Sequence, residues 1–419
     1  MKILHTADIH VDSPLRGLSA VGDAPVDELR GATRMAVENL VDLAVRDAVD
    51  CVVVAGDLYD SERDDYDTAV FLHRQFARLV ESGIPVVLAY GNHDAASEIT
   101  RRLRPPQGVR VLALDAPETV VLGDLGLAVH GQSYATRAIT DNLSAAYPAP
   151  VPGMANVGVL HTALDGRPGH DPYAPCTVDG LVARGYAYWA LGHVHQRDDI
   201  ERDGQHIVFP GNLQGRHAKE TGPKGATVVV FDGDRVVSAT HHPLDVVRWV
   251  RVTVDVSGAT DVDEVCTRVV DAVAGSPDVV DGMLCAIRVA VVGEMAATDR
   301  LVVDRQRWTT QLRADLAGSS GRRWLEKVEL RTSRPERAAG AASDAVQAVR
   351  DLVATAAADP GLQAELAGIF DPLRTRLGAE AGALDAVGAT GLGPAGVAAL
   401  LPEVEALLLA ELGGDRRAG

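Results

Sequence analysis

Five short clusters in the first 195 residues hold side chains that bind hard divalent metals. They read Asp8-Ile9-His10, Gly56-Asp57-Leu58-Tyr59-Asp60, Gly91-Asn92-His93-Asp94, His161 and Gly192-His193-Val194-His195. Carboxylate, amide and imidazole ligands without a thiolate favour Mn²⁺, Fe²⁺ or Zn²⁺ over copper. Together they supply enough ligands for two adjacent cations, which would lie about 3.5–4 Å apart. The sequence therefore predicts a two-metal site, the kind that hydrolyses phosphate esters.

Each cluster falls at or just after the end of an apolar run that predicts a β-strand. Strands are expected at 2–7, 50–55, 85–90, 156–161 and 187–192, one for each cluster in turn. In open α/β sheets, functional groups gather beyond the carboxyl ends of the strands. Clusters that are distant in the sequence are therefore expected to converge in one pocket.

The other apolar segments of residues 1–244 predict more strands and three amphipathic helices. Strands are expected at 109–114, 119–131 (a hairpin), 206–210, 225–232 and 235–241, and helices at 30–48, 66–82 and 177–185. Strand–helix alternation followed by hairpins predicts a mixed sheet, or two sheets with helices outside.

Two further regions follow the first domain. Residues 245–335 alternate between strand and helix patterns, which predict the elements 248–257, 261–274, 283–293, 298–317 and 324–332 of a small α/β domain. Residues 336–419 are rich in Ala and Leu, with helices expected at about 342–358, 361–377 and 394–413. The last helix carries an apolar stripe that either docks on its own chain or binds a partner.

Composition bears on the class of protein. The formal net charge of -18 argues against a protein that coats DNA, since neutralising phosphates requires basic side chains. The four cysteines are widely spaced and form no CxxC pair, as expected of free thiols in a reducing compartment: Cys51, Cys176, Cys266 and Cys285. A cleaved signal peptide would remove Asp8 and His10, and no run of about 18 apolar residues predicts a membrane span. We therefore expect a cytoplasmic protein.

The order of these motifs resembles that of the calcineurin-like metallophosphoesterase superfamily. Within it, residues 5–10 and 56–60 resemble the SbcD/Mre-type group of DNA-repair nucleases. Residues 12–15 (Asp-Ser-Pro-Leu) and 211–217 (Gly-Asn-Leu-Gln-Gly-Arg-His) are more similar to a YhaO-like branch. The match covers about residues 1–244, and the following region matches a capping domain only by position and pattern.

The resemblance implies an α/β (α+β) fold and an order of domains. A metallophosphoesterase two-sheet β-sandwich flanked by helices would form a nuclease domain over residues 1–244. A small α/β capping domain over 245–335 would follow, and then a helical C-terminal region over 336–419, which is a candidate partner-docking segment.

The resemblance also implies roles for the clustered side chains, with manganese as the usual metal. It assigns one cation to Asp8, His10, Asp57 and His195. It assigns the other to Asp57, Asn92, His161 and His193. His93 would be the catalytic histidine, oriented by Asp94, and would protonate the leaving sugar oxygen. Some members of the nuclease group carry a second histidine where this chain has Asp60.

The leading hypothesis is a metal-dependent DNA exonuclease or endonuclease that acts in DNA repair. The resemblance implies an SMC-like or other coiled-coil ATPase as partner, and a homodimer as the assembly. Two alternatives stay open: a small-substrate phosphodiesterase or phosphatase on the same fold, and a non-catalytic scaffold subunit. Candidate contacts to the DNA backbone are the basic residues after the GNHD turn and on the Gly-rich loop: Arg101, Arg102, Arg104, Arg216 and His217.

Overall fold

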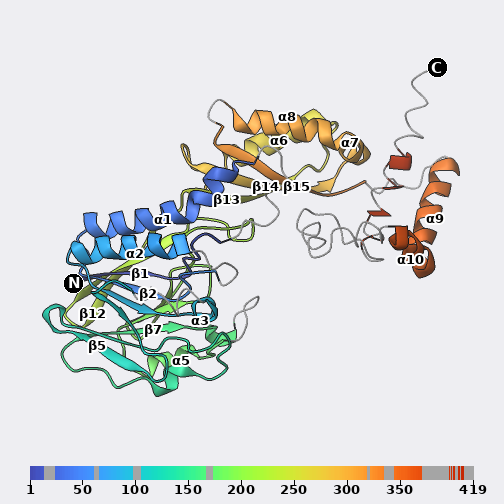
Figure 1. Cartoon of the computed structure of the whole chain (residues 1–419). Helices are drawn as coiled ribbons and strands as arrows, with labels where there is room; N and C mark the ends of the chain where they lie inside the picture. The colour runs from blue at the N-terminus through green and yellow to red at the C-terminus, as the bar shows by residue number, and fades with distance from the viewer. Residues whose placement is uncertain are drawn as a thin grey trace. The chain divides into compact units, whose positions relative to one another are not determined.

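The computed structural model of the chain groups into two compact units (Figure 1). Unit 1 comprises Met1–Pro14 and Asp27–Trp249, and unit 2 comprises Leu15–Val26 and Val250–Gly419. The structure describes residues 1–13, 24–60, 66–97, 105–166, 173–318, 321–334 and 344–369, with isolated positions between 396 and 409. All five clusters of candidate metal ligands belong to unit 1.

The first sheet of unit 1 has six strands in the order β12-β11-β1-β2-β3-β4. They are β1 (Lys2–Thr6), β2 (Cys51–Ala55), β3 (Val86–Ala89), β4 (Val109–Val111), β11 (Gly225–Asp232) and β12 (Arg235–Pro243). Strands β1 to β4 run parallel, and β11 and β12 extend the sheet as an antiparallel hairpin. Strand β2 is buried along its whole length, which explains its unbroken apolar run, because a central parallel strand is covered on both faces.

The second sheet also has six strands, in the order β5-β6-β7-β8-β10-β9. They are β5 (Glu118–Leu122), β6 (Leu127–Gly131), β7 (Ala155–His161), β8 (Tyr188–Gly192), β9 (Asp198–Arg202) and β10 (Gln205–Phe209). Strands β6, β7, β8 and β10 run parallel, whereas β5 and β9 are antiparallel edges. The carboxyl ends of β7 and β8 therefore lie side by side.

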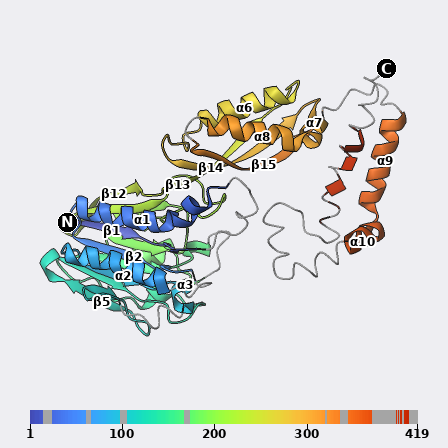
Figure 2. The same cartoon turned by 45° about the horizontal axis from the view of Figure 1, so that its top comes forward.

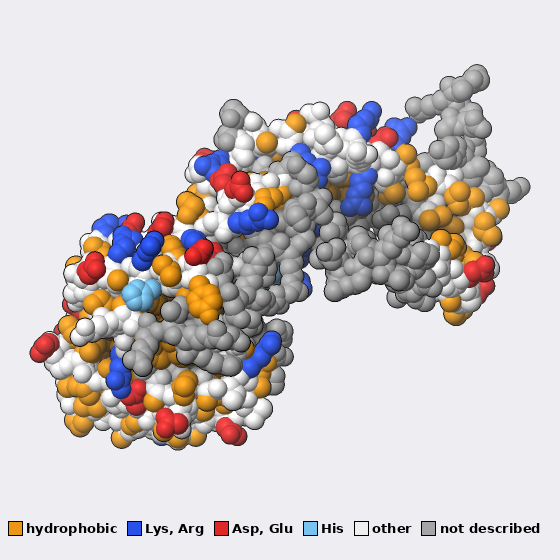
Figure 3. Space-filling model, viewed as in Figure 1, with side chains coloured by type: hydrophobic (Ala, Val, Ile, Leu, Met, Phe, Trp, Pro, Cys, Tyr) orange, Lys and Arg blue, Asp and Glu red, His pale blue; other side chains and the backbone are white. Residues whose placement is uncertain are grey.

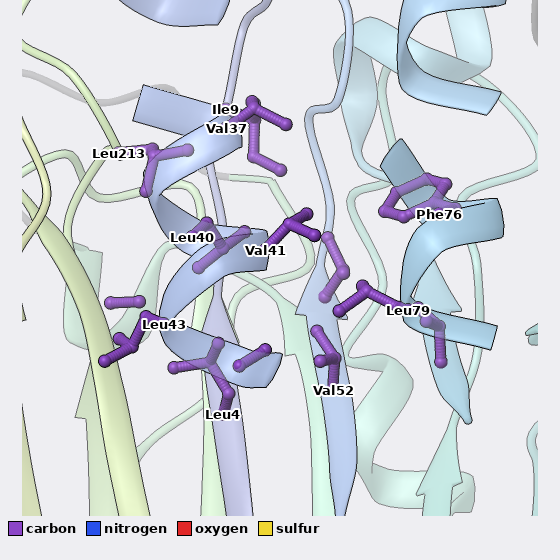
Figure 4. Close-up of a cluster of buried hydrophobic side chains, with 14 of the residues drawn as sticks. Leu4, Ile9, Val37, Leu40, Val41, Leu43, Val52, Phe76, Leu79 and Leu213 are labelled. Atoms are coloured by element: carbon purple, nitrogen blue, oxygen red, sulfur yellow. The ribbon is translucent and has the colours of Figure 1, made fainter. Parts of the chain in front are cut away.

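Two long helices, α1 (Val26–Arg46) and α2 (Tyr66–Glu81), cover one face of the first sheet, as Figures 1 and 2 show. Leu40 and Val41 of α1 and Leu79 of α2 share a buried cluster with Leu4 and Val52 of the sheet (Figure 4). Buried positions recur every three or four residues along α1, which is the periodicity of an amphipathic helix. This packing fixes β1 and β2, which lead to the first two clusters.

The other face of the first sheet packs against the second sheet. Val53 and Val87 from the first sheet and Val157, Ala190 and Val208 from the second belong to one buried cluster. A further cluster covers the outer face of the second sheet, where the short helix α5 (Val178–Val182) contributes. Unit 1 is therefore a sandwich of two sheets with helices outside.

His5 on β1 ties the two sheets together. Its Nδ1 lies 2.9 Å from the hydroxyl oxygen of Tyr188, and its Nε2 lies 3.2 Å from the carbonyl oxygen of Leu191. Burial lowers the pKa of His5 to about 3, so the ring is neutral at pH 7. This histidine is a packed residue of the sandwich.

Unit 2 contains a three-stranded sheet in the order β13-β14-β15, with helices on one side. The elements are β13 (Val247–Asp255), α6 (Val262–Ala274), β14 (Leu284–Glu294), α7 (Thr298–Val303), α8 (Arg305–Ala317) and β15 (Arg323–Ser333). Val265 and Val269 of α6 and Leu312 of α8 share a buried core with Ile287 and Val289 of β14. Two more helices, α9 (Asp344–Ala358) and α10 (Pro360–Ile369), follow along the chain.

The expected fold class is confirmed: two large mixed sheets flanked by helices, a small third sheet and C-terminal helices. Edge strand β9 was not expected, and the helix expected over 298–317 is divided at Asp304 into α7 and α8. Most of the helix expected over 394–413 lies outside the described residues. The domain boundaries at 244 and 335 stay predictions. In the described parts of the chain, we find no helix with the length and apolar character to cross a bilayer.

Candidate metal centre

The five clusters converge at the carboxyl ends of neighbouring strands. Asp8 follows β1 and Asp57 follows β2, while Asn92 begins the short helix α3 (Asn92–Ala96) after β3. From the second sheet, His161 ends β7, and His193 follows β8 directly. Because the two sheets pack face to face, these side chains meet at one end of the sandwich.

The carboxylate of Asp57 lies at the centre of the pocket. Its Oδ2 is 3.7 Å from His10 Nε2 and 3.4 Å from His161 Nε2. On one side, His195 Nε2 lies 3.3 Å from His10 Nε2 and 4.0 Å from Asp8 Oδ1. Potential ligand atoms within 4.8 Å of one another fall into three overlapping groups: Asp8 with His10 and His195, His10 with Asp57 and His93, and Asp8 with Asp57 and His161.

Asn92 and His193 complete the wall on the His161 side. Asn92 Oδ1 lies 2.9 Å from His161 Nε2. The ring of His193 is centred 5.1 Å from that of His161, and its backbone N–H donates to both carboxylate oxygens of Asp8. The structure thus brings together all seven side chains expected to bind metal.

Hydrogen bonds orient the ring nitrogens for cation binding. His161 Nδ1 lies 2.9 Å from the carbonyl oxygen of Ala55, an acceptor, so Nδ1 carries a proton. Nε2 of the neutral ring then presents a lone pair toward Asp57 Oδ2 and Asn92 Oδ1, which are also acceptors. Facing acceptors repel unless a positive charge lies between them, so these residues fit divalent cations.

In the chain without metal, protons substitute for cations. Burial disfavours the charged ring of His161, but the neighbouring Asp57 carboxylate outweighs it and raises the pKa to about 9. Burial likewise opposes ionisation of Asp57, but His161 and His10 hold its pKa below the usual range. Metal binding must therefore displace a proton from His161, and metal affinity is expected to fall as the pH falls below about 9.

Four of the candidate ligands have left-handed backbone conformations. The φ angles are 49° at Asp8, 44° at His10, 55° at Asp57 and 99° at His193. Such conformations cost about 1–3 kcal/mol each in residues other than glycine, and they cluster at functional sites. Backbone hydrogen bonds hold the loops in place, with Asp8 N–H donating to the carbonyl of Gly56 and His10 N–H to that of Asp57.

His93 lies beside this pocket and remains partly open to solvent, with its side chain 27% exposed. Its ring centroid is 4.9 Å from that of His10, and its Nδ1 is 3.5 Å from Asp60 Oδ1. Burial disfavours the charged ring, but the hydrogen bond to Asp60 and the charge of Asp57 raise the pKa of His93 above its ordinary value. This environment favours the protonated ring that a general acid needs.

That Asp94 orients His93 stays a prediction, and the carboxylate of Asp94 accepts three backbone N–H groups. Its Oδ1 accepts the backbone N–H groups of Leu58 and Tyr59, and its Oδ2 accepts that of Gly91. It therefore braces the turn before Asn92 against the loop after Asp57. Burial and the charge of Asp57 raise its pKa to about 7.

Of the five basic residues expected to contact DNA, the structure describes two, and these differ in exposure. Arg101, Arg102 and Arg104 lie outside the described residues. The side chain of His217 is 56% exposed, whereas that of Arg216 is only 16% exposed and is paired with Asp60 and Glu220. Arg216 is therefore held by internal ion pairs, and its contact with DNA stays a prediction.

The sequence predicted no role for two carboxylates of the site, one of which, Asp60, it had placed in a cluster. Glu220 Oε1 lies 2.6 Å from His195 Nδ1, and Asp60 faces His93. Asp60 belongs to the GD-x-x-D motif, and this motif indicated that its side chain would lie near the site. Glu220 belongs to no such motif, because it lies outside every cluster and reaches His195 only through the fold.

Replacing Gly192 with alanine is expected to destabilise unit 1 and to displace His161. A Cβ at Gly192 would overlap the carbonyl oxygen of Ala55 and would lie 2.9 Å from His161 Nδ1. Overpacking of this kind costs about 1–3 kcal/mol, which urea unfolding would measure, and Mn²⁺ affinity should fall as well. Gly123→Ala, where no atom lies within 4 Å of the new Cβ, is the control. Unchanged stability and affinity in Gly192→Ala would contradict this geometry.

Comparison with known proteins agrees with the site. Residues 1–197 match the calcineurin-like phosphoesterase family, and residues 249–333 match the middle domain of the metallophosphoesterase YhaO. Residues 1–197 therefore carry a calcineurin-like metallophosphoesterase domain. The chain is 36% identical over 263 residues to the uncharacterised metallophosphoesterase YhaO of Bacillus subtilis, an alignment that covers 62% of this chain and 64% of that protein. The superfamily implies metal-dependent hydrolysis of phosphate esters.

Two other similarities are more distant. The DNA double-strand break repair protein Mre11 of Sulfurisphaera tokodaii is 26% identical over 246 residues, covering 56% of this metallophosphoesterase and 60% of that protein. The chain thus spans less than two thirds of the length of these curated relatives. A dimetal phosphatase from Danio rerio has 12% identity and a TM-score of 0.37, covering 57% of this chain and 98% of that structure.

Proposed function

We propose that this metallophosphoesterase is a two-metal-dependent DNA nuclease, acting as an exonuclease or endonuclease in DNA repair. The observation that carries the proposal is the position of Asp57 Oδ2, within 3.4 Å of His161 Nε2 and 3.7 Å of His10 Nε2. A carboxylate between two sets of ligands is placed to bridge two cations. Mn²⁺ is the proposed metal, and the oxygen and imidazole ligands also suit Fe²⁺ or Zn²⁺.

The residues of the chain have distinct parts in the proposed reaction. When bound, the cations would supply Lewis-acid activation of water and of the phosphate ester. Asp8, His10 and His195 would hold one cation, and Asn92, His161 and His193 the other, with Asp57 shared. His93, with its pKa raised, donates a proton to the leaving sugar oxygen. Asp60 stabilises the protonated ring and orients it through Nδ1.

DNA as the substrate is supported by the similarity to Mre11. The net charge of -18 does not favour unaided binding to DNA, and basic and acidic side chains are interspersed on the face of unit 1 in Figure 3. We therefore propose that an SMC-like or other coiled-coil ATPase assists, and that the active form is a homodimer. The four free cysteines support a cytoplasmic location.

A metal-dependent assay on three substrates tests the proposal. Wild-type and Asp57→Ala protein are compared on end-labelled single-stranded DNA, on duplex ends and on a chromogenic phosphodiester, with Mn²⁺ or EDTA. We expect Mn²⁺-dependent cleavage of DNA that Asp57→Ala lacks. Turnover of the chromogenic ester alone would favour a small-substrate phosphodiesterase. No cleavage by Mn²⁺-loaded protein, even with its ATPase partner, would favour a scaffold.

A further inference from the structure

The loop from Gly211 to Glu220 supplies none of the expected metal ligands, yet it ends against one of them. Glu220 is buried, and its carboxylate accepts hydrogen bonds on both oxygens. Oε1 lies 2.6 Å from His195 Nδ1. Oε2 accepts the backbone N–H of Arg216 at 2.7 Å and the side-chain N–H of Asn212 at 3.0 Å. The loop therefore fixes this carboxylate in position from one side, while His195 contacts it from the other.

This contact determines which nitrogen of His195 can bind a cation. A carboxylate only accepts, so the 2.6 Å contact places the ring proton on Nδ1. Nε2 then presents its lone pair toward His10 Nε2 at 3.3 Å and Asp8 Oδ1 at 4.0 Å. A histidine held through its second nitrogen by a carboxylate is a common arrangement around protein metal sites, where it fixes ring orientation and increases ligand basicity.

Arg216 extends this arrangement to the other side of the site. Its Nη2 lies 3.3 Å from Glu220 Oε1, and its Nη1 lies 3.5 Å from Asp60 Oδ2. Nη2 also lies 3.2 Å from His195 Nδ1, but with the proton on Nδ1 it donates to the carboxylate of Glu220. The other oxygen of Asp60 faces His93. One guanidinium group thus joins the carboxylate behind His195 to the carboxylate behind His93.

We propose that Glu220 is a positioning residue that holds His195 in the metal-binding tautomer and orientation, and that Arg216 secures it by linking Glu220 to Asp60. The inference rests on the proposed two-metal site but not on the choice of DNA as substrate. The loop from Gly211 to Glu220 would then contribute to metal affinity, although its sequence contains none of the expected metal ligands.

Mn²⁺ binding measured by titration calorimetry on metal-free protein tests the proposal without reference to catalysis. Glu220→Ala should weaken binding at one of the two sites by about 10–100-fold and leave the other site less affected. Glu220→Gln, which keeps the shape of the side chain but replaces one acceptor oxygen with a donor, should give an intermediate loss and guards against misfolding. Arg216→Met should weaken the same site by a smaller factor.

The matched control is Asp199→Ala. Asp199 Oδ1 lies 3.1 Å from His206 Nδ1, which is the same kind of pair in the same unit, but His206 is not among the candidate ligands. Its removal should leave Mn²⁺ affinity unchanged. An affinity loss as large as that of Glu220→Ala would show a general effect on the fold and would overturn the proposal.

A double-mutant cycle separates positioning from a structural role. If Glu220 acts through His195, adding Glu220→Ala to His195→Ala should cause no further loss of Mn²⁺ affinity. Additive losses would overturn the proposal. If the wild-type chain binds no Mn²⁺, the two-metal site itself fails. If it binds two ions and Glu220→Ala binds them equally well, only the positioning role fails.

Discussion

Replacing His93 with alanine should lower kcat by about 10²–10⁴-fold while leaving the Mn²⁺ content at the wild-type level. The ring lies at the partly exposed edge of the pocket, and its Nδ1 is 3.5 Å from Asp60 Oδ1. Its raised pKa keeps a proton available for the leaving oxygen. Turnover of whichever phosphodiester the wild type cleaves, together with metal analysis by mass spectrometry, would measure both effects.

His73→Ala provides the control, because His73 is an exposed histidine on α2. It should change neither quantity. If His93→Ala lost both activity and metal, His93 would be a metal ligand. This outcome is tested because the ring nitrogens of His93 and His10 and the carboxylate of Asp57 form one group of possible ligand atoms. Full activity in His93→Ala would remove it from the reaction.

Replacing Asp57 with asparagine should reduce activity to background and the Mn²⁺ content from two ions per chain to one or none. Oδ2 is the atom that lies near both His10 and His161, and the substitution removes its charge. Oδ1 accepts the backbone N–H of His93 at 3.0 Å, and an asparagine carbonyl can still accept that bond. The fold should therefore survive, so that the loss reports on the cations themselves.

Asp42→Asn is the matched surface substitution, since the Asp42 side chain is 60% exposed and forms its ion pair with Arg78 on α2. It should bind two ions and turn over substrate normally. If Asp57→Asn also kept both ions and its turnover, Asp57 would not bridge them, and the assignment of ligands would have to change.

The parts of the site that could be predicted are those carried by strand ends. The run Cys51-Val52-Val53-Val54-Ala55 predicts a buried strand, so Asp57 is expected beyond its carboxyl end. The same reasoning places Asp8 and His161. Parallel pairing of neighbouring strands then brings the groups together without any knowledge of loop structure.

The parts that could not be predicted depend on loop conformation. Asp94 follows His93 directly, yet in the first turn of α3 its carboxylate accepts the backbone N–H groups of Leu58 and Tyr59. Glu220 lies 25 residues after His195, at the end of the loop that follows β10, and it meets His195 only in the folded chain. Neither contact follows from periodicity, which specifies the face of a strand or helix but not the path of a loop.

The same limit applies to the boundaries of elements. The apolar spacing of residues 298–317 continues through Asp304, so a single helix is expected where the structure has α7 and α8. Edge strand β9, with the sequence Asp-Asp-Ile-Glu-Arg, has little apolar character, and it forms because β10 offers an open edge for pairing. Tertiary contacts decide such cases.

Anomalous diffraction from crystals grown with Mn²⁺ would test the central claim most directly. We predict two peaks about 3.5–4 Å apart, with Asp57 between them, His10 and His195 beside one peak and His161 and Asn92 beside the other. A single peak, or peaks bound elsewhere with these side chains unliganded, would contradict the two-metal centre.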